Sequence, residues 1–249
     1  MDSRLDSGVA REWVRRWDRQ QERYIADREE RFRIIGDVVE RVCEGVDAPV
    51  VVDLGCGPGS LTTRLRERLA GRVVGVDADR FLLELAHATD SGADYLHADL
   101  TAPGWTDGVG GKWDAAVSTT ALHWLRPEDL AALYRELAEV IRPGGVLVDG
   151  DHLREPQPTL RDLAAHVRDR RAERAGVTGN EEWRRWWESV RADPHLTGLF
   201  TTEELSCRHG GYGNGLGPDE HVAMLRSAGF AEAGVVWQYG DDHVLVAVR

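Results

Sequence analysis

The sequence of 249 residues is long enough for one α/β domain with a sizeable core and a modest additional region. Its composition, 42% hydrophobic and 30% charged, contains no apolar run near the roughly 20 residues that cross a bilayer, so no membrane span is predicted. Acidic residues outnumber basic ones by 43 to 31, and the net charge of −12 argues against nucleic acid as a partner, because phosphates would be repelled.

Short-range features narrow the class of protein further. Residues 1–16 are charged and lack the apolar stretch of a secretory signal, so we expect a cytoplasmic protein. The three cysteines have neither the number nor the spacing of a disulfide framework or a zinc site. Asp149, Asp151 and His152 lie close together, but three ligands in one short run rarely hold an ion, so no metal is predicted.

The first segment of the chain, from about residue 8 to 44, has the pattern of amphipathic helices. Trp13 and Trp17 stand four positions apart, and apolar residues continue at steps of three and four as far as Val42. Such an apolar face has to pack against another part of the protein. We therefore predict that residues 1–44 form an N-terminal helical lid.

Short apolar runs and helical stretches alternate between residues 49 and 150, which is typical of βαβ units. The pattern predicts strands over 50–54, 72–76, 95–98, 115–118 and 146–150, and helices over 60–70, 80–89 and 127–141. Proline and glycine at 142–145 end the last helix. The fold class is α/β, with a Rossmann-like, doubly wound, mostly parallel sheet.

This alternation stops after the fifth strand and returns near the end of the chain. Residues 152–216 contain Trp183, Trp186 and Trp187 on one helical face and a glycine-rich loop, and are predicted as a helical cap insertion. A helix over 218–228 and a hairpin of strands 233–239 and 243–248 follow. The hairpin completes a seven-stranded sheet with an antiparallel edge strand, and the core unit comprises 45–151 and 217–249.

One loop follows the first strand directly and contains glycine at alternate positions. The strand Val50–Leu54 runs into Asp53 and then Gly55, Gly57 and Gly59, which lets bare backbone approach a ligand. A dinucleotide fingerprint would place its third glycine at residue 60, which is serine here. The acid Asp53 also suits a cationic ligand better than a pyrophosphate, and a purely structural turn is the third alternative.

The run from Asp53 to Gly59 resembles the first motif of the class I S-adenosylmethionine-dependent methyltransferases. Asp77 after the second strand and Asp99 after the third match that family's acids for ribose and adenine, although helix capping and a turn are alternatives for them. Residues 113–125, with His123 and Trp124, resemble the fourth-strand motif of the small-molecule group that includes trans-aconitate methyltransferases. Together the matches cover about residues 50 to 148.

The resemblance implies S-adenosylmethionine as cofactor and S-adenosylhomocysteine as product. It assigns the cofactor to Asp53, Gly55, Cys56, Gly57, Gly59, Asp77, Ala78, Asp99, Leu100 and Ser118. Methyl transfer to O, N or C of a small molecule then depends mainly on positioning and on excluding water. A carboxylate or a secondary metabolite is the kind of acceptor that the resemblance favours.

Candidate groups for the acceptor follow from the lid, the cap and the strand ends. His123 is the first candidate for a general base and His152 the second, while a carboxylate acceptor would need no base. Aromatic residues either enclose the substrate or pack the cap: Trp13, Trp17, Tyr24, Trp124, Trp183, Trp187 and Tyr212.

Two alternatives remain at this stage. The first is a methyltransferase for RNA or protein, which would need an open groove and, for RNA, basic residues. The second is a non-catalytic partner or sensor that only binds the cofactor. The protein is expected to be a monomer or a homodimer.

Overall fold

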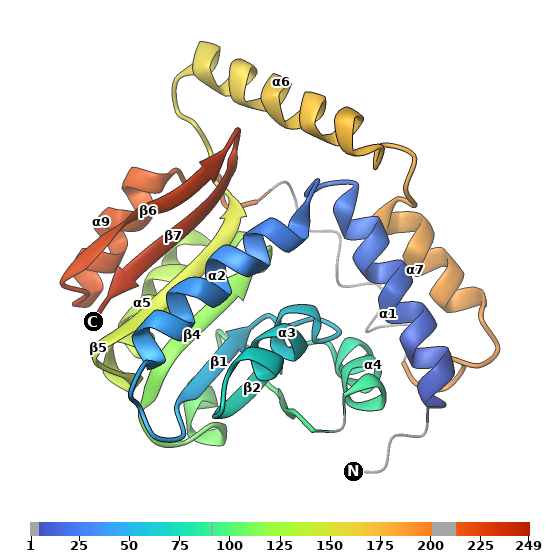
Figure 1. The fold of residues 1–249 in the computed structure, drawn as a ribbon, viewed down its shortest axis with the longest axis horizontal. Coiled ribbons are helices and arrows are strands. Elements are labelled where there is room, and N and C mark those ends of the chain that lie inside the picture. Colours follow the sequence, from blue (N-terminus) through green and yellow to red (C-terminus); the bar gives the residue numbers. More distant parts are fainter. Residues whose placement is uncertain (1–4, 91, 201–212) are drawn as a thin grey trace.

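The computed structural model describes residues 5–90, 92–200 and 213–249. Within them the chain forms one seven-stranded sheet with the order β3-β2-β1-β4-β5-β7-β6 (Figure 1). The strands are β1 (Val50–Leu54), β2 (Arg72–Asp77), β3 (Asp94–His97), β4 (Trp113–Thr119), β5 (Ile141–His152), β6 (Glu232–Tyr239) and β7 (Asp242–Val248). The predicted Rossmann-like sheet is confirmed.

The direction of the strands differs from the prediction in one respect. Strands β1 to β5 pair in parallel, and β7 is antiparallel to both β5 and β6. The antiparallel strand is therefore inside the sheet, and the edge strand is β6. The predicted antiparallel terminal hairpin is confirmed, but its antiparallel strand is not the edge strand, because β7 folds back to pair with β5 along residues 146–152.

The helices are α1 (Ser7–Glu22), α2 (Arg28–Cys43), α3 (Ser60–Arg68), α4 (Arg80–Thr89), α5 (Pro127–Val140), α6 (Pro158–Ala175), α7 (Trp183–Ala192) and α9 (Pro218–Ala228), with short 3-10 turns at Trp105–Gly108 and Leu122–Trp124. Most predicted helix ends are confirmed to within two residues. Strand β5 begins earlier than predicted, because Ile141 already pairs with Trp113. No helix in the described ranges is long and apolar enough to cross a membrane.

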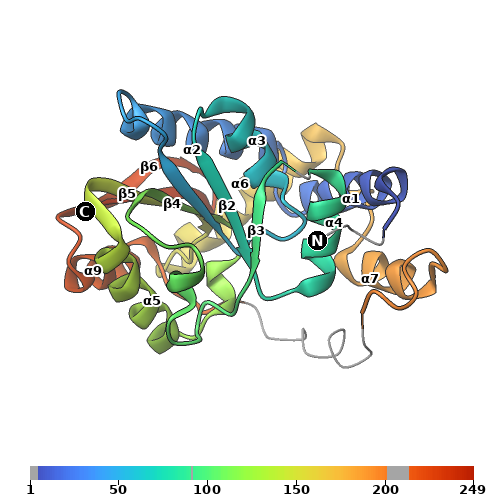
Figure 2. The same ribbon diagram turned by 90° about the horizontal axis from the view of Figure 1, so that it is seen from below.

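Two apolar layers hold the helices on the two faces of the sheet. Along β1, Val51 packs beneath α2 and α3, and Val52 and Leu54 pack on the opposite side with α5 and α9. Figure 2 shows the same separation of α2 and α3 from α5 and α9. Because neighbouring side chains on a strand point to opposite faces, the apolar run of β1 supplies both layers.

The predicted N-terminal lid contains two helices with different surroundings. Helix α2 packs Phe32, Ile35 and Val39 on the sheet, next to α3. Helix α1 instead contacts α4 and α7. Asp27, with a left-handed φ of 59°, lies in the turn between the two helices. By its contacts α2 belongs to the core, and only α1 lies outside it.

The region after β5 covers the side of the molecule that α1 occupies. Helix α7 lies beside α1, whereas α6 extends past the body of the protein and contacts it mainly near β6 (Figure 1). Trp186 is fully buried and its ring lies 5.6 Å from that of Trp13 and 5.0 Å from that of Trp17. The predicted helical face of three tryptophans is confirmed as a packing surface for α1 and α4.

Candidate functional site

The glycine loop turns sharply away from the end of β1. Gly55, Gly57 and Gly59 have φ of 67°, 55° and 83°, a region that favours glycine. A Cβ on Gly55 would lie 2.3 Å from that of Ala121, and one on Gly59 would lie 2.4 Å from the Tyr95 hydroxyl. These glycines are therefore required by the loop's own conformation and neighbours, besides any ligand.

Asp77, at the end of β2, holds this loop in place. Its Oδ2 accepts a hydrogen bond of 2.8 Å from the Gly57 N–H, and its Oδ1 accepts one of 2.7 Å from the Asp79 N–H. The helix-capping role that was an alternative for Asp77 is taken by Asp79, whose Oδ1 accepts from Phe81 and Leu82. Asp77 thus lies against the loop and is half-buried.

Asp53 is fully buried at the end of β1. Its Oδ2 accepts a hydrogen bond of 2.6 Å from the Thr62 hydroxyl, whereas Oδ1 has no hydrogen-bond partner among the described residues. Burial, with repulsion from Asp77, raises the pKa of Asp53 to about 7, although the Thr62 bond and attraction to Arg28 act against this. An ionised Asp53 would be stabilised by a cation placed at Oδ1.

Arg28 is a buried site residue that the sequence did not reveal. It lies in the first turn of α2, stacks over Phe32 at 4.6 Å and donates from Nη1 to Asp18 at 2.7 Å. Its buried Nε has no partner within the described part of the chain. The charged run around it is typical of a solvated helix face, and only the packing of α2 on the sheet explains its burial.

Two further predicted cofactor residues lie at the ends of β2 and β3. The Ala78 carbonyl accepts from His97 Nε2 at 3.1 Å, which joins the two strand ends. Asp99 is exposed, and its Oδ1 accepts from the N–H and the hydroxyl of Thr101, both at 2.8 Å. The turn role that was an alternative for Asp99 is therefore present in the structure.

The remaining predicted cofactor residues are more enclosed. Ser118, on β4, is buried and donates from Oγ to the Leu54 carbonyl at 2.9 Å. Cys56 is buried in the loop, and burial raises the pKa of its thiol. Leu100 packs, partly buried, against the core. All of these positions lie at or just beyond the carboxyl ends of neighbouring parallel strands, where ligands bind in open α/β sheets.

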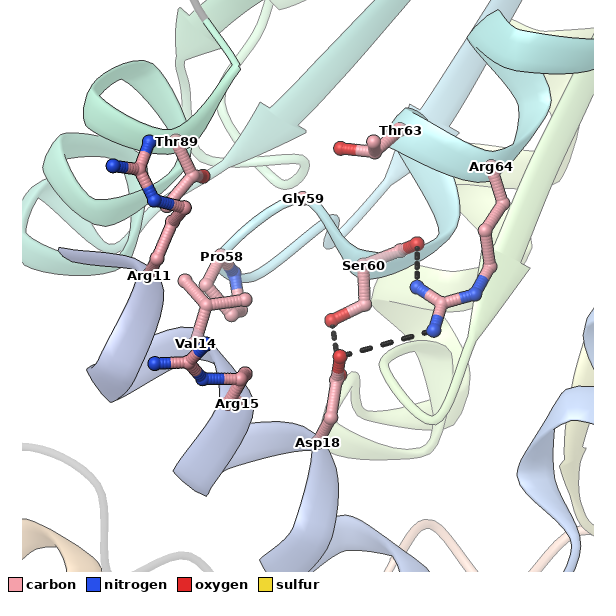
Figure 3. A pocket seen from close by; sticks show the side chains of 10 residues that line it. All are labelled: Arg11, Val14, Arg15, Asp18, Pro58, Gly59, Ser60, Thr63, Arg64 and Thr89. Atoms are coloured by element: carbon pink, nitrogen blue, oxygen red, sulfur yellow. Dashed lines mark hydrogen bonds and ion pairs between the residues drawn. The ribbon is translucent and has the colours of Figure 1, made fainter. Parts of the chain in front are cut away.

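A pocket of about 210 Å³ lies between α1 and the outer side of the glycine loop (Figure 3). The Asp18 carboxylate crosses it to accept from the Ser60 hydroxyl at 2.6 Å and to pair with Arg64 at 3.8 Å. Its lining residues are Arg11, Val14, Arg15, Asp18, Pro58, Gly59, Ser60, Thr63, Arg64 and Thr89. Of the predicted cofactor residues only Gly59 is among them.

His123 and Asp151 form a close pair where β4 and β5 end. The imidazole Nδ1 lies 2.8 and 2.9 Å from the two carboxylate oxygens, and Asp151 Oδ1 also accepts from the His152 N–H at 2.8 Å. Asp151 is buried, yet the hydrogen bond from His123 and the attraction of Arg31 outweigh burial and lower the pKa of this carboxyl. Asp151 is thus held as a carboxylate facing the imidazole.

Asp149, two residues earlier on β5, differs from Asp151 in its hydrogen bonds and in the direction of its pKa shift. Both of its oxygens are buried without a hydrogen-bond partner among the described residues. Burial and repulsion from Asp151 raise its pKa well above the ordinary value. Nearby, the Tyr134 hydroxyl lies 2.7 Å from His221 Nδ1. The pKa values of the two acids of β5 are therefore shifted in opposite directions, that of Asp151 downward and that of Asp149 upward.

The second candidate base, His152, faces a different partner. Its Nδ1 lies 3.4 Å from Asp241 Oδ1 in the turn before β7, and Asp241 also pairs with Arg168 of α6. Within the described residues, His123 is the histidine that contacts the carboxylate at the end of β5.

The predicted aromatic residues fall into distinct groups. Trp13 and Trp187 are buried in the cluster around Trp186, with partly buried Trp183 beside them. Tyr24 is exposed and its hydroxyl accepts from the Trp183 N–H.

Two other tryptophans lie near the polar groups of the site. Trp17 lies 3.7 Å from where a Cβ of Gly57 would be, and Trp124, 55% exposed, lies 4.7 Å from the His123 ring. Tyr212 lies outside the described residues.

Comparison with known proteins places this arrangement in a family. The Methyltransf_25 family, described as a methyltransferase domain, matches residues 51–145. "Trans-aconitate 2-methyltransferase" of Streptomyces coelicolor is 30% identical over 249 residues, covering 94% of this chain and 69% of that protein. The chain belongs to the class I S-adenosylmethionine-dependent methyltransferases. Over 132 residues it is 40% identical to the Azoarcus protein of the same name, covering 53% of this chain and 49% of that protein. The chain thus spans about half the length of the first curated relatives it matches.

Solved structures show the same fold at low sequence identity. Magnesium protoporphyrin IX methyltransferase of Synechocystis, solved with S-adenosylhomocysteine bound, superposes with a TM-score of 0.57 at 17% identity and covers 95% of this chain and 94% of its own. CalS10 of Micromonospora echinaspora, solved with its cofactor, superposes with a TM-score of 0.55 at 17% identity. The match covers 88% of this chain and 90% of that chain.

The glycine loop of this chain fits the cofactor of that family. The amino-acid end of S-adenosylmethionine carries an ammonium and a carboxylate. Beside the loop, Asp53 offers a buried oxygen without a partner and Arg28 a buried N–H without one. An ammonium and a carboxylate would complete these two groups, since buried polar atoms are almost always hydrogen-bonded.

Proposed function

We propose that this protein transfers the methyl group of S-adenosylmethionine to O, N or C of a small-molecule acceptor, leaving S-adenosylhomocysteine. The observation that carries the proposal is the complementary pair of unsatisfied buried groups at the glycine loop, Asp53 Oδ1 and Arg28 Nε. A charged pair poised in this way suits an amino-acid zwitterion and not a pyrophosphate, because Asp53 would repel phosphate oxygens.

The other cofactor contacts follow from the strand ends. Asp77 would accept from the ribose hydroxyls, and Asp99 would accept from the adenine amino group. Ala78, Leu100, Ser118 and the loop residues would line the nucleoside and the sulfonium. When bound, the cofactor supplies an electrophilic methyl group on a positively charged sulfur.

The acceptor is proposed to be a small organic molecule. The curated relatives are named for trans-aconitate, an organic acid, and an acidic metabolite fits this chain as well. We assign residues 152–216 to a cap, and we expect Trp17 and Trp124 to contact the acceptor because Trp17 lies near Gly57 and Trp124 near His123. A cytoplasmic monomer or homodimer, acting on neither nucleic acid nor membrane, completes the proposal.

Calorimetry with S-adenosylhomocysteine tests the cofactor site directly. Replacing Arg28 by Gln should weaken binding roughly ten- to a hundredfold, because a hydrogen bond to a charged group contributes about 1.5–3 kcal/mol. Arg33→Gln is the matched control, since Arg33 lies on the same helix but is exposed and pairs with Glu30.

The control variant should bind S-adenosylhomocysteine as the unaltered protein does, and a thermal melt of both variants checks that they fold. If the unaltered protein binds neither S-adenosylmethionine nor S-adenosylhomocysteine, the proposed function is wrong. Release of S-adenosylhomocysteine in the presence of an acceptor separates an enzyme from a protein that only binds the cofactor.

A further inference from the structure

The pair of His123 and Asp151 determines which atom of the imidazole is available to an acceptor. Asp151 is an ionised carboxylate with both oxygens within 2.9 Å of Nδ1, so Nδ1 carries a hydrogen and donates it. In the neutral ring, Nε2 is then left with a lone pair.

Nε2 is the atom of this pair that remains open. No hydrogen bond to Nε2 occurs within the described part of the chain, and 20% of the His123 side chain is exposed. His123 therefore presents a hydrogen-bond acceptor at the carboxyl end of β4, on the ligand-binding edge of the sheet.

The charges around the pair disfavour a second anion next to Nε2. The titratable groups that act on Asp151 or its neighbours from the packed elements are Asp149 and His152 of β5, Arg31 of α2, Tyr134 of α5 and His221 of α9. Arg31 is committed to Asp242, to which its Nε donates at 2.8 Å. Beside the neutral ring, a hydroxyl can donate its hydrogen to the lone pair of Nε2, whereas a carboxylate has no hydrogen to donate and would meet the field of Asp151.

We propose that the group methylated in this protein is a hydroxyl, whose proton His123 Nε2 accepts, and that Asp151 is the positioning residue that fixes the ring for this role. The inference rests on the proposed function and names the attacking group in it. A carboxylate elsewhere in the acceptor molecule is compatible with it.

The proposed step balances in atoms and charge. The hydroxyl oxygen forms the new bond to the methyl carbon while the bond from that carbon to sulfur breaks and leaves its electron pair on sulfur. The hydroxyl proton passes to Nε2, and Asp151 stabilises the imidazolium that results. The products are a methyl ether and S-adenosylhomocysteine, and His123 later releases its proton to water.

An isotope experiment tests whether the attacking group is a carboxylate, even while the acceptor molecule itself is unidentified. The protein is incubated with S-adenosylmethionine carrying a labelled methyl group and a small-molecule extract of the organism that encodes it. Products are then treated with mild alkali, which hydrolyses methyl esters to methanol and leaves methyl ethers intact. We expect the label to stay in an alkali-stable product, and release of the label as methanol would overturn the inference.

Three variants test the roles of the two residues. His123→Gln and Asp151→Asn should lower kcat by about a hundredfold or more, with KM changing far less, because they remove the base or its orientation. The acid limb of the pH profile should disappear in His123→Gln, which no longer carries the base. Asp149→Asn is the matched control, because Asp149 is an equally buried acid of the same strand that makes no hydrogen bond to His123 or to any other described residue; its kcat should change by only a few fold.

Equal loss of kcat in Asp151→Asn and Asp149→Asn would overturn the positioning role. Nitrogen NMR of His123 in the protein bound to S-adenosylhomocysteine gives a readout that needs no turnover: the hydrogen should be on Nδ1, and a ring with its hydrogen on Nε2 contradicts the proposal. Absence of any labelled product in every preparation would instead contradict the proposed function itself. A labelled ester would leave that function standing and overturn only the hydroxyl assignment.

Discussion

The two ends of the site, the glycine loop after β1 and the pair at the ends of β4 and β5, are built in different ways. At the glycine loop, two buried polar side chains from different elements, Arg28 of α2 and Asp53 of β1, keep atoms without a hydrogen-bond partner among the described residues, Arg28 Nε and Asp53 Oδ1. At the other end, His123 and Asp151 are 28 positions apart and satisfy each other.

The glycine loop is therefore suited to binding a charged ligand, whereas the His123–Asp151 pair is already arranged to accept a proton. Leaving a buried polar atom without a hydrogen bond costs folding free energy, which a bound ligand that supplies the partner can restore. The paired end needs no ligand to be stable. The comparison therefore predicts that cofactor binding changes the stability of the protein, and the pH dependence of that stability, mainly through the groups at the glycine loop.

The largest effect is expected in the aromatic cluster that joins α1 to α4 and α7. Trp186→Ala should lower the free energy of unfolding by about 3–5 kcal/mol, because it empties a fully buried indole site. Urea unfolding measures the loss. Trp124→Ala is the control for stability, since 55% of Trp124 is exposed, and it should cost far less.

Equal losses in the two tryptophan variants would mean that the cluster is not part of the cooperative core. The loop end of the site would then lack a fixed cover, and the contrast between the two ends would need another explanation. A large loss only in Trp186→Ala would show that α1 is held over the loop by packing.

The next effect concerns the pH dependence of stability at the glycine loop. The folded pKa of Asp53 is raised to about 7, so the folded protein holds this proton more tightly than the unfolded chain does. The contribution of this proton to the free energy of unfolding is complete at pH values below the ordinary Asp pKa of about 4. It is lost as the pH rises through about 7. A shift of this size corresponds to at most ~4 kcal/mol.

Without ligand, the stability of the unaltered protein should therefore fall relative to that of Asp53→Asn as pH rises from 5 to 8. Denaturant unfolding at several pH values measures the difference. Asp37→Asn replaces an exposed acid and should give a flat difference over the same range. A flat difference for Asp53→Asn would show that Asp53 does not keep its proton in the folded protein.

Much of the loop end could be predicted from sequence because its geometry is local. The order of strand, acid and alternating glycines fixed the positions of Asp53 and Gly57, and Asp77 lies where the next strand ends. Arg28 could not be predicted, because its role depends on the packing of α2 against a sheet whose strands come later in the sequence.

The other end could be predicted only in part. His123 followed from its motif, but Asp151 was considered only as a poor metal ligand. Its partnership depends on the register of β4 with β5, which pairs Ser118 with Asp149 and Thr119 with Gly150. A one-residue shift would point Asp151 to the other face of the sheet. Such a register is set by long-range packing and is not visible in spacing.

The smallest effect is expected at Thr120, in the turn that leads from β4 to His123. Its φ of 56° is left-handed, which is unfavourable for a β-branched residue. Its N–H donates to the Gly150 carbonyl at 3.0 Å and Arg31 donates to its hydroxyl at 3.4 Å. Thr120→Gly should relieve the strain and raise the free energy of unfolding by about 0.5–1 kcal/mol, as measured by urea unfolding.

Ala48→Gly is the control that separates the effect of backbone strain on stability from its effect on turnover. Ala48 also has a positive φ, 49°, but it lies in an exposed turn far along the chain from His123. Both glycine variants should gain stability, but only Thr120→Gly should lose turnover, since the preorganised end of the site depends on a turn held in one conformation. Unchanged turnover in Thr120→Gly would show that the hydrogen bond to Asp151 alone is sufficient to orient His123, and the strained turn would then have no part in the difference between the two ends.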